Sequence, residues 1–310
     1  MQVGIVIPCY NEEEVLPETV GRIIELLSRL KQSSLISADS QAWFVDDGST
    51  DQTWDVIERF ATDSEEIRGI KLSRNRGHQN ALLAGLLTAE GDALISIDAD
   101  LQDDINVIEQ MIKEHEQGVE IVYGVRKSRT TDSFFKRFTA QTFYKSLQAM
   151  GAKAVYNHAD FRLMSRPAIE ALKDFREVNI FLRGIVPLIG FSSSIVYYER
   201  SERFAGVSKY PLRKMVGLAL DGITSFSVAP LRMITLVGFI VFLFTVVMTV
   251  WVFWIRLFTD QAIPGWASTV LPIYLVAGVQ ILCTGIIGEY LGKIYNEVKR
   301  RPRYIIEKMV

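Results

Sequence analysis

Two aspartates separated by one residue are the side chains that point most directly to chemistry in this sequence. Asp98 and Asp100 follow the apolar run 93–97 and precede Leu101-Gln102-Asp103. Hard divalent ions such as Mg²⁺ or Mn²⁺ take oxygen ligands of this kind and commonly share them with substrate phosphates. Because any acidic turn also produces an Asp-x-Asp pattern, the pair predicts a metal site only if its surroundings build one.

Three further polar segments also follow apolar runs. They are residues 8–11, 46–50 and 73–80. Taken singly, each could be a plain turn, since Asp, Asn and Gly are ordinary turn formers. Four such segments in succession favour a shared binding site.

The second of these segments has two readings. Asp46 or Asp47 could bind the base or ribose of a nucleotide, whereas Ser49, Thr50 and Asp51 suit the N-cap of a following helix. The two readings are compatible, and the sequence leaves both open.

The elements around these segments alternate between strand and helix. Apolar runs predict strands at 3–7, 42–45, 67–72, 93–97 and 120–123, and helical apolar spacing predicts helices at 12–30, 51–60, 81–86 and 105–115. This alternation indicates an α/β domain whose mostly parallel sheet is covered on both faces. Since such sheets bind ligands at the carboxyl ends of their strands, we expect the four polar segments to converge there.

The C-terminal third differs in character. Residues 233–255 and 267–288 are uncharged and long enough to cross a bilayer core of about 30 Å. A pair of buried core helices is the alternative. Basic residues gather in the tail 291–310, whereas the link between the runs holds only Arg256, so we expect an integral plasma (inner) membrane protein with both termini cytoplasmic. Before the spans, residues 210–232 suit amphipathic helices at the membrane interface or a plain helical linker.

Composition excludes other classes. A formal net charge of −2 gives no support to a nucleic-acid partner. The two cysteines, Cys9 and Cys283, lie in different contexts, so no disulfide is expected. No cleavable signal peptide is expected, because acids follow the short first apolar run.

Glycines in the second apolar run, residues 267–288, suit close helix packing, and we expect a homo-oligomer.

Four motifs together resemble those of family 2 glycosyltransferases. Residues 5–12, 45–51, 72–79 and 98–103 read IVIPCYNE, VDDGSTD, LSRNRGHQ and DADLQD. Their order and spacing match over roughly the first 200 residues. The resemblance implies a GT-A type nucleotide-sugar-binding domain over residues 1–209, cytoplasmic and catalytic, followed by the interface segment 210–232, two transmembrane helices within 233–290 and the tail.

Two later segments narrow the resemblance to polyprenyl-phosphate glycosyltransferases. Residues 159–164 (ADFRLM) and 200–210 (RSERFAGVSKY), with the two spans, are similar to bactoprenol glucosyltransferases and, less closely, to dolichol-phosphate mannose synthases. Members of the family usually carry two prolines after Leu-Gln-Asp, where this chain has Asp104-Ile105, so the loop beside the metal is expected to differ in shape.

The resemblance implies a role for each group of polar residues. The base and ribose of the nucleotide sugar would meet Pro8, Tyr10, Glu12 and Asp47, with Arg74, Gln79 and Asp98 completing the donor site. Asp98 and Asp100 would hold Mg²⁺ or Mn²⁺, Asp160 would be the catalytic carboxylate, and the acceptor phosphate would meet Arg200, Arg203, Ser208 and Lys209.

The implied reaction is the inverting transfer of a hexose, with glucose from UDP-glucose as the leading choice, to polyprenyl (undecaprenyl) phosphate. Since the second pKa of a phosphate monoester is about 6, the acceptor is already anionic and needs no strong base. Asp160 could position the acceptor, accept its last proton or stabilise positive charge on the sugar. Arg203 and Lys209 could instead bind anionic membrane lipid.

Several alternatives differ in substrate or class. Mannose from GDP-mannose or a UDP-linked aminopentose could replace glucose. A processive polysaccharide synthase would carry a Gln-x-x-Arg-Trp motif, and this sequence has no Arg-Trp pair. A non-catalytic membrane scaffold would not need three site carboxylates. A dinucleotide-dependent oxidoreductase is disfavoured because no Gly-x-Gly-x-x-Gly follows the first strand.

Overall fold

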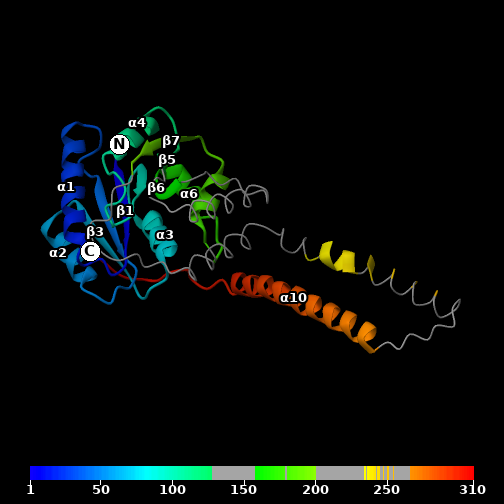
Figure 1. Cartoon of the computed structure of the whole chain (residues 1–310). Helices are drawn as coiled ribbons and strands as arrows, with labels where there is room; N and C mark the ends of the chain where they lie inside the picture. Colours follow the sequence, from blue (N-terminus) through cyan, green and yellow to red (C-terminus); the bar gives the residue numbers. More distant parts are fainter. Residues whose placement is uncertain are drawn as a thin grey trace. The chain divides into compact units, whose positions relative to one another are not determined.

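The computed structural model of the chain describes residues 1–127, 158–178, 180–199 and 266–310, with a few positions between 234 and 254 (Figure 1). The chain forms two compact units. One comprises Met1–Val216 together with Arg301–Val310, and the other comprises Gly217–Arg300.

The described residues of the first unit form an eight-stranded sheet with the order β7-β5-β6-β4-β1-β2-β3-β8. Its strands are β1 (Val3–Cys9), β2 (Gln41–Asp46), β3 (Ile67–Leu72), β4 (Ala93–Ser96), β5 (Ile121–Arg126), β6 (His158–Ser165), β7 (Ser193–Tyr198) and β8 (Ile306–Met309). β1 pairs in parallel with β2 and β4, β2 with β3, and β5 with β7, whereas β6 and β8 run antiparallel to their neighbours. The prediction of a mostly parallel α/β sheet is confirmed.

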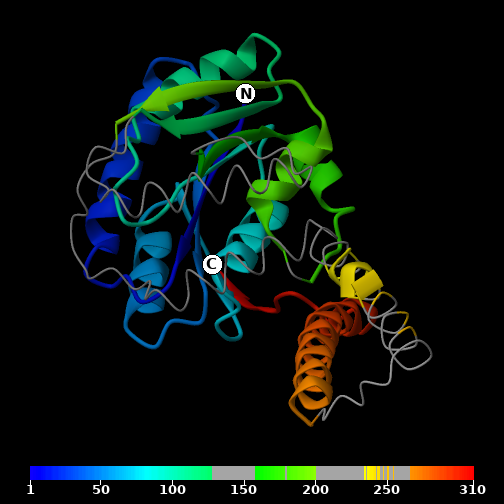
Figure 2. The same cartoon turned by 45° about the vertical axis from the view of Figure 1, so that its right-hand side comes forward.

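Helices cover both faces of this sheet (Figures 1 and 2). They are α1 (Leu16–Gln32), α2 (Thr53–Asp63), α3 (His78–Thr88), α4 (Val107–Glu116), α6 (Arg166–Leu172) and α7 (Leu182–Ile185), which runs into the 3₁₀ turn η1 (Val186–Ile189). Each predicted helix is present, with boundaries shifted by a few residues. α1 begins only at Leu16, because the carbonyl of Glu12 first closes a turn by accepting the N–H groups of Val15 and Leu16.

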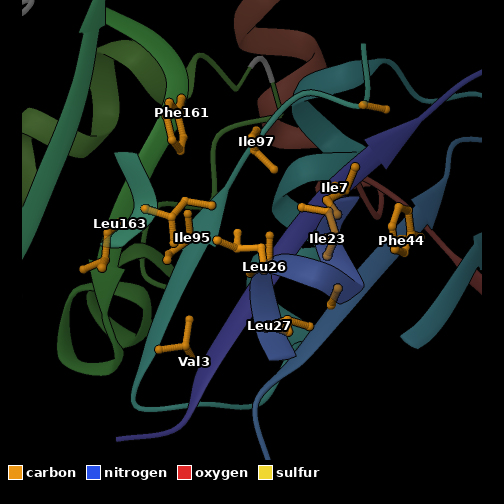
Figure 3. Packing of buried hydrophobic residues seen from close by; sticks show 14 of the residues in the cluster. Val3, Ile7, Ile23, Leu26, Leu27, Phe44, Ile95, Ile97, Phe161 and Leu163 are labelled. Carbon is orange, nitrogen blue, oxygen red and sulfur yellow. The ribbon is translucent and has the colours of Figure 1, made fainter. Parts of the chain in front are cut away.

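The alternation of side chains along the fully buried β1 divides the core between the two faces. Val3, Ile5 and Ile7 belong to the cluster that contains α1 residues such as Ile23 and Leu27 (Figure 3). Val6 points the other way, toward α3. A strand buried on both sides in this way needs a continuous apolar run, and residues 3–7 supply it.

The last residues of the chain form β8, which the sequence analysis did not predict. The sequence predicts only a basic tail over residues 291–310. β8 instead pairs antiparallel with β3, and Gly69 and Val310 exchange backbone hydrogen bonds of 2.9 and 3.0 Å. The C-terminal residues therefore cover the edge of the sheet, where unpaired N–H and C=O groups would otherwise face solvent.

The second unit contains α10 (Trp266–Val298), which includes the second predicted span, residues 267–288. Within the part of the chain that the structure describes, no helix combines the length and the hydropathy needed to cross a membrane. The prediction of two spans therefore has no support in the structure. The first span, residues 233–255, and the interface segment 210–232 lie largely or wholly outside the described residues.

Candidate functional site

The loops after β1 and β2 are joined by hydrogen bonds between side chains and backbone. Ser49 Oγ accepts from the N–H of Asn11 at 3.0 Å, and Asn11 Oδ1 accepts from the N–H of Thr50 at 2.8 Å. Thr53 Oγ1 accepts from the N–H of Glu12 at 2.9 Å. The interpretation of Ser49, Thr50 and Asp51 as N-cap residues is wrong, because the N-cap of α2 is Gln52. The side chains of Ser49 and Thr50 bond to Asn11 in the first loop instead, and Asp51 Oδ1 accepts the N–H of Thr53 at 3.0 Å.

The loop after β2 is joined in turn to the loop after β3 through Asp47. Its two carboxylate oxygens accept the backbone N–H groups of Arg76 and Gly77 at 2.7 and 2.9 Å. Asp47 is almost fully buried, and burial raises its pKa although the two N–H donors oppose this. In this structure the carboxylate predicted to contact the nucleotide therefore holds the β3 loop in place.

Gly48 allows the two loops to approach each other closely. Its φ is +64°, and a Cβ there would lie 2.5 Å from the carbonyl carbon of Arg74. Only glycine meets both conditions without strain. Of the remaining residues predicted for the donor, Pro8 pairs with Val45 inside the sheet, Tyr10 is 39% exposed just after β1, and Arg74 is exposed.

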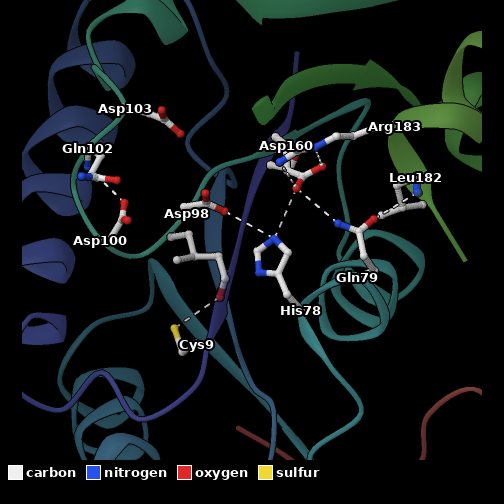
Figure 4. A network of polar contacts seen from close by, with 12 residues as sticks. Cys9, His78, Gln79, Asp98, Asp100, Gln102, Asp103, Asp160, Leu182 and Arg183 are labelled. Atoms are coloured by element: carbon white, nitrogen blue, oxygen red, sulfur yellow. Dashed lines mark hydrogen bonds and ion pairs between the residues drawn. The ribbon is translucent and has the colours of Figure 1, made fainter. Parts of the chain in front are cut away.

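The loops after β3 and β4 meet at the carboxylate of Asp160, which lies on β6 (Figure 4). His78 Nε2 lies 3.4 Å from Asp98 Oδ1 and 3.6 Å from Asp160 Oδ2. Gln79 Nε2 donates to Asp160 Oδ2 at 3.2 Å, and Gln79 Oε1 accepts the N–H of Leu182 at 3.0 Å. Gln79, predicted for the donor site, thus contacts Asp160. The predicted convergence of the four polar segments on one edge of the sheet is confirmed.

Two arginines complete the surroundings of Asp160. Arg162 is buried and donates to Asp160 Oδ1 at 2.6 Å. Arg183, from α7, donates to both oxygens, at 3.2 and 2.9 Å, and its side chain is 34% exposed. Together with His78, they place three cationic groups around one buried carboxylate.

These contacts set the protonation states at the site. Burial alone would raise the pKa of Asp160, but Arg183, His78 and Arg162 outweigh it and hold that pKa well below its usual range. Burial lowers the pKa of His78, yet the hydrogen bond to Asp160 and the charge of Asp98 raise it to about 9. For Asp98, burial and the neighbouring acids raise the pKa to about 6 although His78 opposes them. At neutral pH His78 is therefore a cation between two carboxylates.

The donor set of the Asp98–Asp103 loop fits a divalent ion that substrate phosphates help to bind. Asp98 Oδ1 is buried, and apart from its 3.4 Å ion pair with His78 it accepts no hydrogen bond from the described residues, so it keeps lone pairs for a ligand. Asp100 lies on the same loop and accepts the N–H of Gln102 at 3.2 Å (Figure 4). The residues described contain no group of three or more His, Cys, Asp or Glu side chains suited to a metal. Two carboxylates are sufficient where phosphates supply further ligands.

The four residues predicted to bind the acceptor phosphate, Arg200, Arg203, Ser208 and Lys209, lie outside the described residues. Their assignment stays a prediction.

His78, Arg162 and Arg183 are not among the residues that the sequence predicts for the site. Arg162 follows Asp160 by two positions on β6, so both point to the same face of the strand, and this spacing was a usable signal. His78 stands in a polar segment that was already assigned to the site. Arg183 offered no signal, because it reaches Asp160 only through the packing of α7.

The sequence is similar to those of known glycosyltransferases. The sequence model described as "Glycosyl transferase family 2" matches residues 4–173. The chain is 52% identical over 305 residues to the uncharacterized glycosyltransferase YkoT of Bacillus subtilis, covering 98% of this chain and 90% of the relative. It is 39% identical over 309 residues to the SfII prophage-derived bactoprenol glucosyl transferase of Shigella flexneri, covering 99% and 98%.

Among solved structures, the chain is similar to mannosyl-3-phosphoglycerate synthase from Rubrobacter xylanophilus, with 16% identity, a TM-score of 0.49 and coverage of 87% of this chain and 80% of that one. The family match extends over more than half of the sequence, and the relatives align along nearly all of it. The chain therefore belongs to glycosyl transferase family 2.

Proposed function

We propose that this protein transfers glucose from UDP-glucose to a polyprenyl (undecaprenyl) phosphate with inversion at the anomeric carbon. The observation that carries the proposal is the position of His78 between Asp98 and Asp160, at 3.4 and 3.6 Å. It brings the loop that suits a donor diphosphate next to a second, buried carboxylate. Relatives named bactoprenol glucosyl transferases that align over almost the whole chain support the choice of sugar and acceptor.

The reaction moves negative charge, and the site supplies cations for it. An oxygen of the acceptor phosphate would bond to the anomeric carbon as the bond from that carbon to the donor diphosphate breaks. A Mg²⁺ or Mn²⁺ ion held by Asp98 and Asp100 would neutralise the leaving diphosphate as a Lewis acid. His78, cationic at neutral pH, lies beside the same loop.

Asp160 is better suited to electrostatics than to proton transfer. With its pKa well below the usual range, it is a weak base, and an anionic acceptor phosphate does not require a strong one. Its carboxylate orients Arg183 and His78, and Arg183, which is partly exposed, is placed to meet an incoming phosphate with charge-assisted bonds. This favours the positioning role among those considered for Asp160.

A lipid acceptor requires access to a membrane, and we include membrane association in the proposal. Exposed apolar side chains on α10 support it, among them Ile281, Leu291 and Val298 at 74%, 61% and 72% exposure. The cytoplasmic location of both termini, the interface segment 210–232 and the homo-oligomer also stay predictions. Separation of lysed cells into membrane and soluble fractions tests the association, since a protein found entirely in the soluble fraction would contradict it.

The activity test uses the purified full chain in detergent with polyprenyl phosphate and radiolabelled UDP-glucose, GDP-mannose or a UDP-linked aminopentose. We expect lipid-linked glucose from UDP-glucose. Asp98→Ala should lower the rate at least about 10²-fold, because removal of one group that stabilises transition-state charge typically costs that much. Asp63→Ala, at an exposed position at the end of α2, should leave the rate unchanged.

Different results separate the alternatives. Transfer from another donor would correct the sugar and keep the reaction class. Equal rates for Asp98→Ala and the wild type would contradict the assigned site. If no donor gave a lipid-linked product, a non-catalytic scaffold of the same fold would be the better interpretation.

A further inference from the structure

A buried carboxylate outside the catalytic group holds the far end of the Asp98–Asp103 loop. Asp103 is 4% exposed, and its Oδ1 accepts from the hydroxyl of Tyr198 and from Arg126 at 3.3 Å. Arg126 Nε also donates to the Tyr198 hydroxyl at 3.1 Å. Three side chains, from the loop and from the ends of β7 and β5, are thus mutually bonded.

This cluster depends on both of its donors. The second oxygen of Asp103, Oδ2, is buried and has no hydrogen-bond partner in the described parts of the chain. Tyr198 and Arg126 therefore compensate the buried charge through one oxygen, and the loss of either donor leaves it poorly satisfied. Burial and the charge of Asp103 raise the pKa of Tyr198, so its hydroxyl keeps the proton that it donates.

The loop that this cluster holds has a strained backbone and is also fixed at its start. Thr19 Oγ1 donates to the carbonyl of Ala99 at 2.8 Å. Between the two attachments, Leu101 adopts a φ of +56°, a left-handed conformation that a non-glycine residue keeps only where the surroundings enforce it. The backbone of this fixed loop sets the orientation of the Asp98 and Asp100 side chains.

The partners of Asp103 also connect the loop to the opposite side of the site. The Tyr198 ring packs edge-to-face on Phe161, at 5.4 Å between centroids, and Phe161 stands between Asp160 and Arg162 on β6. Tyr198 ends β7, just before the predicted acceptor residue Arg200 in the sequence.

We propose that Tyr198, Asp103 and Arg126 act as positioning residues that fix the Asp98–Asp103 loop for binding of a divalent ion with the donor diphosphate, and couple that loop to β7. An effect of these residues on the rate of sugar transfer rests on the proposed function, whereas their effect on binding of the divalent ion does not.

Tyr198→Phe is the direct test, because it removes the hydroxyl and keeps the ring against Phe161. The neighbouring Tyr197, which is 56% exposed, provides the matched control Tyr197→Phe. The dissociation constant of Mn²⁺ in the presence of saturating UDP is measured from the electron paramagnetic resonance signal of the free ion, well below the unfolding temperature.

We expect the Mn²⁺ dissociation constant of Tyr198→Phe to rise about 10–100-fold, the usual effect of losing a partner that orients metal ligands, while Tyr197→Phe matches the wild type. Amide hydrogen exchange in residues 99–103 should also become faster. An unchanged dissociation constant overturns the inference, even if Tyr198→Phe is less heat-stable, because the role would then be structural only.

A second variant guards against failure of Tyr198→Phe to fold. Arg126→Met removes the partly exposed donor and should raise the same constant in the same direction. A wild type that binds no Mn²⁺ with UDP also overturns the inference. A wild type that binds Mn²⁺ but transfers no sugar contradicts the proposed function alone, and the comparison of variants then still decides the inference.

Discussion

The most unusual residue of this site is Asp160, a buried carboxylate with three cationic neighbours. Two of them differ sharply in environment. Arg162 has a side chain only 1% exposed, whereas that of Arg183 is 34% exposed. Since screening by water weakens an ion pair and burial makes an unpaired charge costly, the two arginines should contribute very differently to stability.

This difference gives a prediction for stability. Arg162→Met should destabilise the fold by about 3 kcal/mol, the lower end for breaking a buried pair, because Arg183 and His78 still face Asp160. Arg183→Met should cost about 1 kcal/mol or less, since its exposed end is hydrated. Thermal unfolding followed by circular dichroism measures both.

Lys173→Met serves as the control, because Lys173 pairs with Glu170 on an exposed helix surface, and we expect a change within about 0.5 kcal/mol. Equal destabilisation by the two arginine variants would show that burial does not increase the contribution of Arg162 to the free energy of unfolding.

At the scale of the elements, the site depends on how closely the loops after β2 and β3 approach. Asp47 accepts two N–H groups of the β3 loop, and Gly48 leaves room for the backbone of Arg74. This contact in turn presents His78 and Gln79, the first residues of α3, to Asp160. The loop contact therefore helps to set the geometry of the candidate site.

We expect Gly48→Ala to destabilise the protein by about 3 kcal/mol, of which roughly 1–2 kcal/mol comes from the left-handed backbone and the rest from overpacking. Sugar transfer should fall by up to about 10²-fold, because small displacements of reacting groups have effects of that size. Unfolding temperature and transfer rate are measured on the same preparations.

Gly118→Ala is the matched control. Gly118 also has a positive φ, +93°, but a Cβ there would meet no atom within 4 Å. It should lose only about 1–2 kcal/mol and keep full activity. If both variants kept full activity, the close contact between the loops would have no role in positioning the site.

At the scale of the whole molecule, the two ends of the sequence share one sheet. β8 covers the edge of β3, Lys308 pairs with Glu58, and Arg303 donates to the carbonyl of Phe175 at 2.6 Å. A Cβ at Gly69 would meet Val310, so the final residue packs closely on the sheet. The chain thus passes through the second unit and returns to complete the first.

Deletion of residues 306–310 should destabilise the first unit by roughly 2–4 kcal/mol, since several backbone hydrogen bonds of about 1 kcal/mol net are lost. The exposed edge of β3 should also promote aggregation. Thermal unfolding and light scattering measure these effects.

Lys308→Gln, the control for this deletion, removes only an exposed ion pair and should change stability by about 0.5 kcal/mol or less. A truncated chain with an unchanged unfolding temperature would contradict the contribution assigned to β8.

The sequence by itself determined the order of strands and helices through β5 and the gathering of polar loops at one edge. It could do so because buried parallel strands need continuous apolar runs and because the carboxyl ends of such strands meet. The motif containing Asp98 and Asp100 likewise identified the loop that fits a metal.

Only the tertiary structure decided which side chains meet. Arg183 reaches Asp160, Tyr198 reaches Asp103, and β8 reaches β3 across long stretches of sequence. The sequence around these residues does not indicate their partners. A short helix, a single tyrosine and a basic tail could each pack at many places in the fold. Packing of the whole chain selects one, because buried charges and sheet edges must find partners wherever the fold provides them.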